Sequence, residues 1–189
     1  QDILERDIRC ILVIEDSPRM YSVLLPLIYK EIMYQTKNLI NRGLRQSRRL
    51  MLLRARPKVL LTQNYETAQK FFKKYKNNTL GIISDVEFLK HGEKVADAGI
   101  NFAKWVQNID QSIPILLQSV QVDNKLIAKN LNTEFLHKKS PTLLKDLRNF
   151  MNYNFGFGNF IFRLPNKKIV KEASTIDEFI NGIIEIPEE

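Results

Sequence analysis

Cysteine is almost absent from the sequence, in which Cys10 is the single cysteine among 189 residues. One cysteine cannot close an internal disulfide, so the sequence is typical of the reducing cytosol and we expect a cytoplasmic location. No apolar run is long enough to span a bilayer. The first residues lack the basic and apolar regions of a signal peptide. These absences argue against a disulfide-stabilised secreted scaffold and against a membrane-spanning protein.

Apolar residues are plentiful, at 44% of the chain, and they include 11 Phe and 6 Tyr, enough for a substantial core. The formal charge of +8 is local, because the seven basic residues of segment 42–58 account for all but one unit of it. Such a patch can bind nucleic acid, an anionic membrane surface or an acidic partner, or it can be a solvated helix face. Those residues are Arg42, Arg45, Arg48, Arg49, Arg54, Arg56 and Lys58.

Short apolar runs alternate with amphipathic segments along most of the chain. Strands are predicted at residues 9–15, 58–63, 80–84, 114–118 and 134–137. Helices are predicted at residues 18–56, 65–75, 98–108, 122–131 and 140–152, with Asn64 as a cap and a kink at Pro26. A polar loop with Gly92 is predicted between the third strand and the helix at residues 98–108. This alternation predicts an α/β fold, a doubly wound parallel five-stranded sheet of flavodoxin-like order 2-1-3-4-5, with an elongated first helix.

The composition changes near residue 152, so we predict a first domain over residues 1–152 and an appendage over residues 153–189. Residues 160–164 and 168–172 predict a hairpin, and Thr175 with Glu178 predicts a capped helix to about residue 186. About 35 residues cannot bury a stable core alone. The appendage is therefore expected to dock on the first domain, to pair with another chain or to begin a further module.

Polar side chains mark the carboxyl ends of the predicted strands. Glu15 and Asp16 end the first, Asp85 the third, Ser119 the fourth, and Lys138 follows the fifth. Ligands of open α/β sheets bind at this edge, so we expect these residues to converge. Clustered carboxylates attract a hard cation such as Mg²⁺, one carboxylate can attack phosphorus, and a lysine and a hydroxyl can bind the transferred oxygens.

From about residue 9 to residue 152 the sequence resembles the receiver domain of two-component response regulators. The resemblance is carried by residues 11–18, 81–86, 114–119 and 135–141, taken together and in this order. It implies that Asp85 accepts a phosphoryl group and that Lys138 pairs with that group. It also implies a histidine kinase or phosphotransfer protein as donor and a C-terminal output module.

The same resemblance assigns the remaining site residues. Glu15 and Asp16 correspond to the acidic pair that holds Mg²⁺, and Glu87 supplies a backbone carbonyl to the metal. Ser119 corresponds to the hydroxyl that bonds a phosphoryl oxygen, and Phe135 to the aromatic switch. Departures from the family pattern, among them Glu87 and Val120, predict an unusual phosphate lifetime.

The long first helix and residues 156–163 resemble receivers fused to a phosphoenolpyruvate synthase-like (pyruvate, water dikinase) module. The apolar Leu50–Leu53 run favours a homodimer through that helix. Three other functions compete: a pseudo-receiver that is never phosphorylated, a nucleic-acid-binding regulator and a flavodoxin-like cofactor binder. Nucleic-acid binding ranks low because no winged-helix or helix-turn-helix module is recognisable. A flavin would need a Ser/Thr/Gly-rich loop after the first strand, which is missing.

Overall fold

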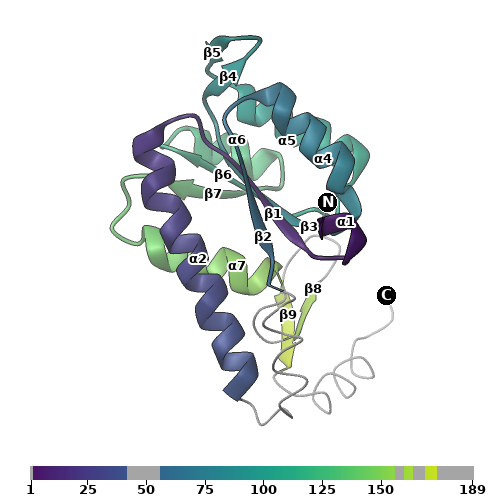
Figure 1. The fold of residues 1–189 in the computed structure, drawn as a ribbon. Coiled ribbons are helices and arrows are strands. Elements are labelled where there is room, and N and C mark those ends of the chain that lie inside the picture. The colour runs from purple at the N-terminus through teal and green to yellow at the C-terminus, as the bar shows by residue number, and fades with distance from the viewer. Residues whose placement is uncertain (1, 42–55, 156–159, 164–168, 174–189) are drawn as a thin grey trace, which may run out of the picture.

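A five-stranded parallel sheet forms the centre of the molecule (Figure 1). The computed structural model describes residues 2–41, 56–155, 160–163 and 169–173. The order β2-β1-β3-β6-β7 confirms the predicted doubly wound topology. The strands are β1 (Cys10–Ile14), β2 (Lys58–Thr62), β3 (Thr79–Asp85), β6 (Ile115–Ser119) and β7 (Glu134–His137).

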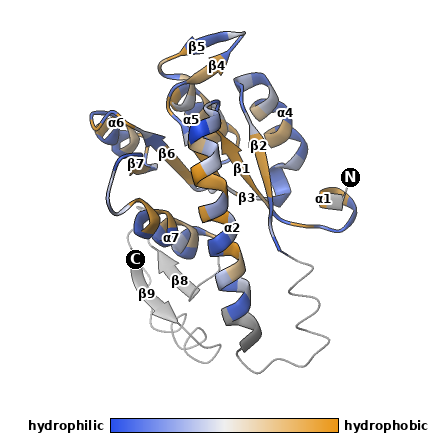
Figure 2. Cartoon of the chain, turned by 60° about the vertical axis from the view of Figure 1, so that its left-hand side comes forward, coloured by the Kyte–Doolittle hydropathy of each residue, from blue (hydrophilic) through white to orange (hydrophobic). Residues whose placement is uncertain are grey.

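Helices cover both faces of the sheet. On one face α2 (Pro18–Asn41) and α7 (Leu143–Asn154) pack against alternate strand residues, among them Ile11, Val13 and Ile83. On the other, α4 (Tyr65–Tyr75), α5 (Ala98–Ile109) and α6 (Asn124–Asn130) pack against the intervening residues, among them Leu12 and Ile82. Strands covered on both sides read as apolar runs, and the sheet is accordingly largely hydrophobic in Figure 2.

Helix α2, which was predicted to follow the first strand, is long, as predicted, and Pro26 lies inside it. Its described part ends at Asn41, so the predicted continuation to residue 56 lies outside the described residues. The same is true of the Leu50–Leu53 run and of most of the basic patch. Within the parts of the chain that are described, no helix combines the length and apolar character needed to cross a membrane.

Two described hairpins lie outside the central sheet. Residues 160–164 and 168–172 were predicted to pair, and β8 (Phe160–Arg163) and β9 (Ile169–Ala173) confirm this; the helix predicted after them lies outside the described residues. The predicted polar loop around Gly92 was wrong, because β4 (Phe88–Lys90) and β5 (Glu93–Val95) pair antiparallel there. His91 and Gly92 form its turn with φ of 53° and 83°. Each strand has only three residues, too few to show an alternating pattern.

Two short helical elements lie at the amino-terminal end of the sheet. A one-turn helix, α1 (Asp2–Glu5), and a 3-10 turn, η1 (Lys76–Asn78), flank it. Cys10 opens β1 with no exposed surface, and its Sγ lies 3.8 Å from the hydroxyl oxygen of Thr79. Asn64 caps α4 as predicted, because its Oδ1 accepts the N–H of Thr67 at 2.8 Å.

Candidate functional site

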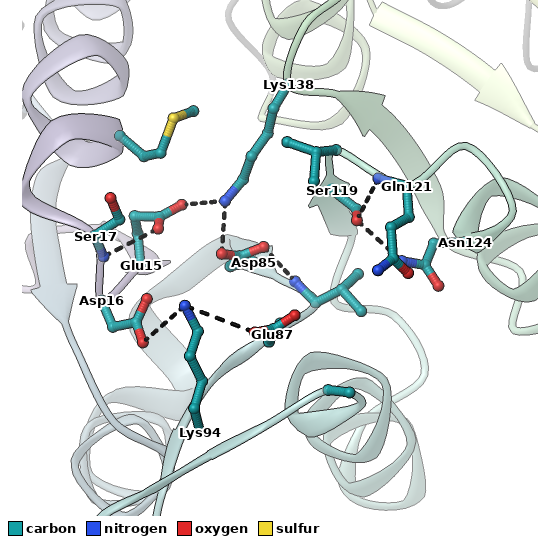
Figure 3. Close-up of a pocket in the computed structure, with 14 residues that line it drawn as sticks. Glu15, Asp16, Ser17, Asp85, Glu87, Lys94, Ser119, Gln121, Asn124 and Lys138 are labelled. Carbon is teal, nitrogen blue, oxygen red and sulfur yellow. Dashed lines mark hydrogen bonds and ion pairs between the residues drawn. The ribbon is translucent and has the colours of Figure 1, made fainter.

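A pocket of about 280 Å³ opens at the carboxyl ends of the central strands (Figure 3). The strand register explains this, since β1, β3, β6 and β7 end side by side. Six of the seven residues predicted for the site line the pocket, and they come from segments up to 123 positions apart. They are Glu15, Asp16, Asp85, Glu87, Ser119 and Lys138.

Lys138 joins two of the acids. Its Nζ lies 2.7 Å from Oε2 of Glu15 and 2.6 Å from Oδ2 of Asp85, with only 6% of its side chain exposed. Its backbone N–H donates to the carbonyl of Ser119 at 2.9 Å, which continues the pairing of β6 with β7 by one residue. The neighbouring Lys139 is exposed. The register therefore directs the first lysine of the pair into the pocket.

Asp85 lies at the end of β3, near the middle of the sheet. Its Oδ1 accepts the N–H of Val86 at 2.8 Å, and the residue is 8% exposed. The N–H of Gly99 donates to the Val86 carbonyl at 2.9 Å. A Cβ at Gly99 would overlap the carbonyl oxygen of Asp85, so α5 can approach this backbone only because position 99 is glycine.

Glu15 is completely buried and fully hydrogen-bonded. Its Oε1 accepts the N–H of Ser17 at 3.2 Å, and its Oε2 accepts Nε2 of Gln118 at 3.1 Å besides Lys138. Burial raises the pKa of Glu15, and the nearby Asp85 carboxylate raises it further, against the opposing effect of Lys138. Sequence reasoning missed Gln118. Its signal is an amide in the last positions of an otherwise apolar strand.

Asp16 contributes an oxygen that is not paired within the described part of the chain. Its Oδ1 is buried and makes no hydrogen bond to any described residue, and its side chain is 10% exposed. Burial is the largest cause that raises the pKa of Asp16, opposed by the charge of Lys94. Oxygens of Glu15, Asp16 and Asp85 lie within 4.8 Å of one another. Three converging carboxylates, one with a free buried oxygen, fit a hard divalent cation such as Mg²⁺.

A second lysine reaches the pocket from β5. Lys94 Nζ lies 4.0 Å from Oδ2 of Asp16 and 3.7 Å from Oε1 of Glu87. The sequence offered no signal for this residue, because the hairpin that carries it was expected to be a loop. The side chain of Glu87 is 47% exposed and directed toward Lys94 (Figure 3). The metal-binding carbonyl expected of Glu87 stays a prediction.

Ser119 and Phe135 differ in their relation to the pocket. Ser119 Oγ accepts the N–H of Gln121 at 3.0 Å and Nδ2 of Asn124 at 2.9 Å. Both bonds use the oxygen as acceptor, which leaves the hydroxyl proton for an oxygen in the pocket. Phe135 lies on β7 opposite Leu117 and packs, half-buried, against the core below α4 and α5. It does not line the pocket, and its switch role stays a prediction.

The arrangement suits attack by a carboxylate on a negatively charged group. Asp85 is bonded to the ammonium of Lys138, and it has an oxygen within 4.8 Å of oxygens of Glu15 and Asp16, with which it can hold a cation. An ammonium group and a cation beside one carboxylate can neutralise the oxygens of an anion while a carboxylate oxygen attacks it.

No family model and no curated protein matches the sequence. Solved structures do match its fold. A response regulator receiver domain protein from Clostridium thermocellum is 18% identical, with a TM-score of 0.54 over 79% of this chain and 95% of that one. The HemR receiver domain from Leptospira biflexa is 17% identical, with a TM-score of 0.50 over 76% and 94%. The chain has the receiver-domain fold.

A third solved structure, that of the phosphorylated cyanobacterial phytochrome response regulator RcpA, is 12% identical, with a TM-score of 0.50 over 78% of this chain and 94% of that one. At these identities the receiver likeness establishes the fold, and the chemistry has to be argued from the pocket. The names of these three structures mention no dikinase, so the predicted link to a dikinase module gains no support from them.

Proposed function

We propose that the chain is a receiver domain in which Asp85 accepts a phosphoryl group in a Mg²⁺-dependent reaction. The observation that carries this proposal is the position of Lys138 Nζ, 2.6 Å from Asp85 and 2.7 Å from Glu15, in a pocket that Asp16 also lines with a buried oxygen that has no partner among the described residues. A structural ion pair would need neither the third carboxylate nor its unpartnered oxygen. RcpA, which shares the fold, is described as phosphorylated, and this supports phosphorylation of the present chain without naming the residue.

Each residue has one task in this reaction. An oxygen of Asp85 attacks the phosphorus atom, a new P–O bond forms, and the bond to the donor's leaving atom breaks. Lys138, already bonded to Asp85, pairs with a phosphoryl oxygen as negative charge moves onto that group. Ser119 donates its hydroxyl proton to a second oxygen. Glu15 and Asp16 would hold Mg²⁺, which would supply additional neutralisation of the phosphoryl charge.

The test is an intact-mass measurement after incubation with Mg²⁺ and acetyl phosphate. We expect a gain of one phosphate that hydroxylamine removes, as it does for acyl phosphates. The gain should be absent with EDTA and absent in Asp85→Asn, whereas Ser119→Ala should retain the site and react more slowly. A wild-type protein that gains no phosphate would favour the pseudo-receiver. A gain that persists in Asp85→Asn would assign the phosphate to another residue.

The wider role follows from the same proposal. A histidine kinase or phosphotransfer protein is the expected donor, the protein is expected in the cytoplasm, and the output is expected from a C-terminal module or a partner. Phe135 lies one strand from Ser119, since β6 pairs with β7, so a shift of Ser119 can reach it through the sheet. We retain residues 1–152 as the receiver and residues 153–189 as the appendage. Fusion to a dikinase module and a homodimer formed through α2 are also retained as proposals.

A further inference from the structure

Two lysines enter the acidic pocket from opposite sides (Figure 3). Lys138 is bonded to two acids and is 6% exposed. Lys94 lies 4.0 Å from Asp16 and 3.7 Å from Glu87, and 54% of its side chain is exposed. Lys138 is therefore part of the buried framework, while Lys94 makes longer contacts and can return to water at little cost.

The hairpin holds Lys94 near the acids, because its own position is fixed against α4. Phe88, with no exposed surface, anchors the hairpin in the core. Lys90 Nζ lies 4.7 Å from the centre of the Tyr65 ring, and the N–H of His91 donates to Oε1 of Glu66 at 2.9 Å. The backbone that carries Lys94 is thus tied to the first turn of α4, and the presence of its ammonium at the pocket follows from the fold.

The formal charges of the pocket show what Lys94 does. Four carboxylates and two ammonium groups line it, an excess of two negative charges, which one divalent cation would neutralise. Without Lys94 the excess would be three. The charged residues are Glu15, Asp16, Asp85, Glu87, Lys94 and Lys138.

We propose that Lys94 is a displaceable counter-cation that competes with the divalent metal at Asp16 and thereby sets how tightly the pocket binds Mg²⁺. This inference rests on the proposed function for the metal site itself. While the metal is absent, the ammonium reduces the repulsion among the carboxylates. When the metal binds, Lys94 must withdraw from Asp16 or stay close to a like charge. Either way metal binding is weaker than the carboxylates alone would make it.

The size of the effect follows from the distances. A unit charge about 5 Å from a divalent ion, in a largely aqueous and salt-screened setting, changes the dissociation constant by a factor of about 3 to 10. We therefore expect Lys94→Met to bind divalent metal about 3 to 10 times more tightly than the wild type. Lys94→Arg keeps the charge and should stay near the wild-type affinity.

The experiment is a Mn²⁺ titration without phosphodonor, in which electron paramagnetic resonance measures free Mn²⁺, followed by displacement with Mg²⁺. Lys90→Met is the matched control, because it removes the same charge from the same hairpin at a side chain that lies over Tyr65. It should change the affinity by less than about twofold, since that ammonium does not line the pocket. In an Asp16→Asn background, Lys94→Met should lose most of its effect.

The outcomes separate this inference from the proposed function. If Lys94→Met binds Mn²⁺ more tightly than the wild type and Lys90→Met does not, the result supports the competition. The same holds if Lys94→Met binds Mn²⁺ measurably and the wild type does not. Equal tightening in Lys90→Met would show a general charge effect and overturn it. An unchanged or weaker Mn²⁺ affinity in Lys94→Met would also overturn the inference. The proposed metal site would still be supported in that case, provided that the wild type binds Mn²⁺. Absence of binding in both proteins would overturn the inference and the metal site together.

Discussion

Removal of the Lys138 ammonium should show how much this one positive charge contributes to the free energy of unfolding. In metal-free protein, Lys138→Met leaves the fully buried Glu15 beside Asp85, whose side chain is 11% exposed, without the ion pairs that now compensate them. Removal of one partner of a buried ion pair costs about 3–5 kcal/mol. The pocket is open on one side, so we expect the lower end of this range, about 3 kcal/mol of unfolding free energy.

Urea unfolding in EDTA measures this loss. Trp105, the single tryptophan, is a suitable fluorescence probe because it packs against Phe72 and Phe102 with ring centres 5.7 and 5.5 Å away. With a denaturant slope of about 2 kcal/mol/M, the midpoint should fall by about 1.5 M. Lys139→Met is the control, because that side chain is exposed and its loss should leave the midpoint nearly unchanged.

Mg²⁺ should reduce the deficit. The pocket of Lys138→Met has one more excess negative charge, so it should bind the metal more tightly, and each tenfold gain in affinity returns about 1.4 kcal/mol at saturation. A loss below about 1 kcal/mol in EDTA would refute the reasoning, because the acids would then be compensated by water or by rearrangement. So would a deficit that Mg²⁺ leaves unchanged.

Two further predictions concern the same acids. Gly99→Ala should destabilise the protein by about 1–3 kcal/mol and slow phosphorylation of Asp85, because the new Cβ overlaps the carbonyl oxygen of Asp85. Urea midpoints measure the loss of stability, and initial rates of mass gain measure phosphorylation. A phosphorylation rate equal to that of the wild type would contradict this prediction. Glu15 has a folded-state pKa above its ordinary value of 4.5, so the folded protein holds this proton more tightly than the unfolded chain does. Its contribution to stability is therefore complete below 4.5 and is lost as pH rises through the folded-state pKa. In EDTA, the stability of Glu15→Gln relative to wild type should increase over that interval, and a difference in urea midpoints that stays flat or falls with pH would contradict the burial argument.

The central sheet could be predicted because its three inner strands, β1, β3 and β6, are covered on both faces. That burial leaves a continuous apolar run, as in β1, where all five residues are buried. Helix α4 could be placed for a local reason as well, because Asn64 caps it with its own side chain. The β4–β5 hairpin could not be predicted, since its strands are short and its anchoring depends on distant partners such as Tyr65.

The candidate site likewise contains residues that could be predicted from the sequence and residues that could not. Its strand-end members could be located because the topology itself brings Glu15, Asp85 and Lys138 to one edge. Residues that reach the pocket acids from a neighbouring strand or from the β4–β5 hairpin were missed. Gln118 reaches Glu15 from a neighbouring strand, and Lys94 reaches Asp16 from the hairpin. Their roles depend on side-chain direction and on tertiary placement, neither of which a one-dimensional pattern contains.

Strand β1 carries a thiol at one end and an acid at the other. Cys10 opens the strand with no exposed surface, and Glu15 directly follows its last residue. A thiol reagent can reach Cys10 only when the amino end of the strand opens, so its labelling rate measures the opening free energy at the end far from the pocket. Where labelling proceeds by an opening smaller than global unfolding, a ligand at Glu15 that slows it acts through the full length of the strand. The protein thus carries a native probe that distinguishes a local effect of metal or phosphate from one transmitted across the sheet.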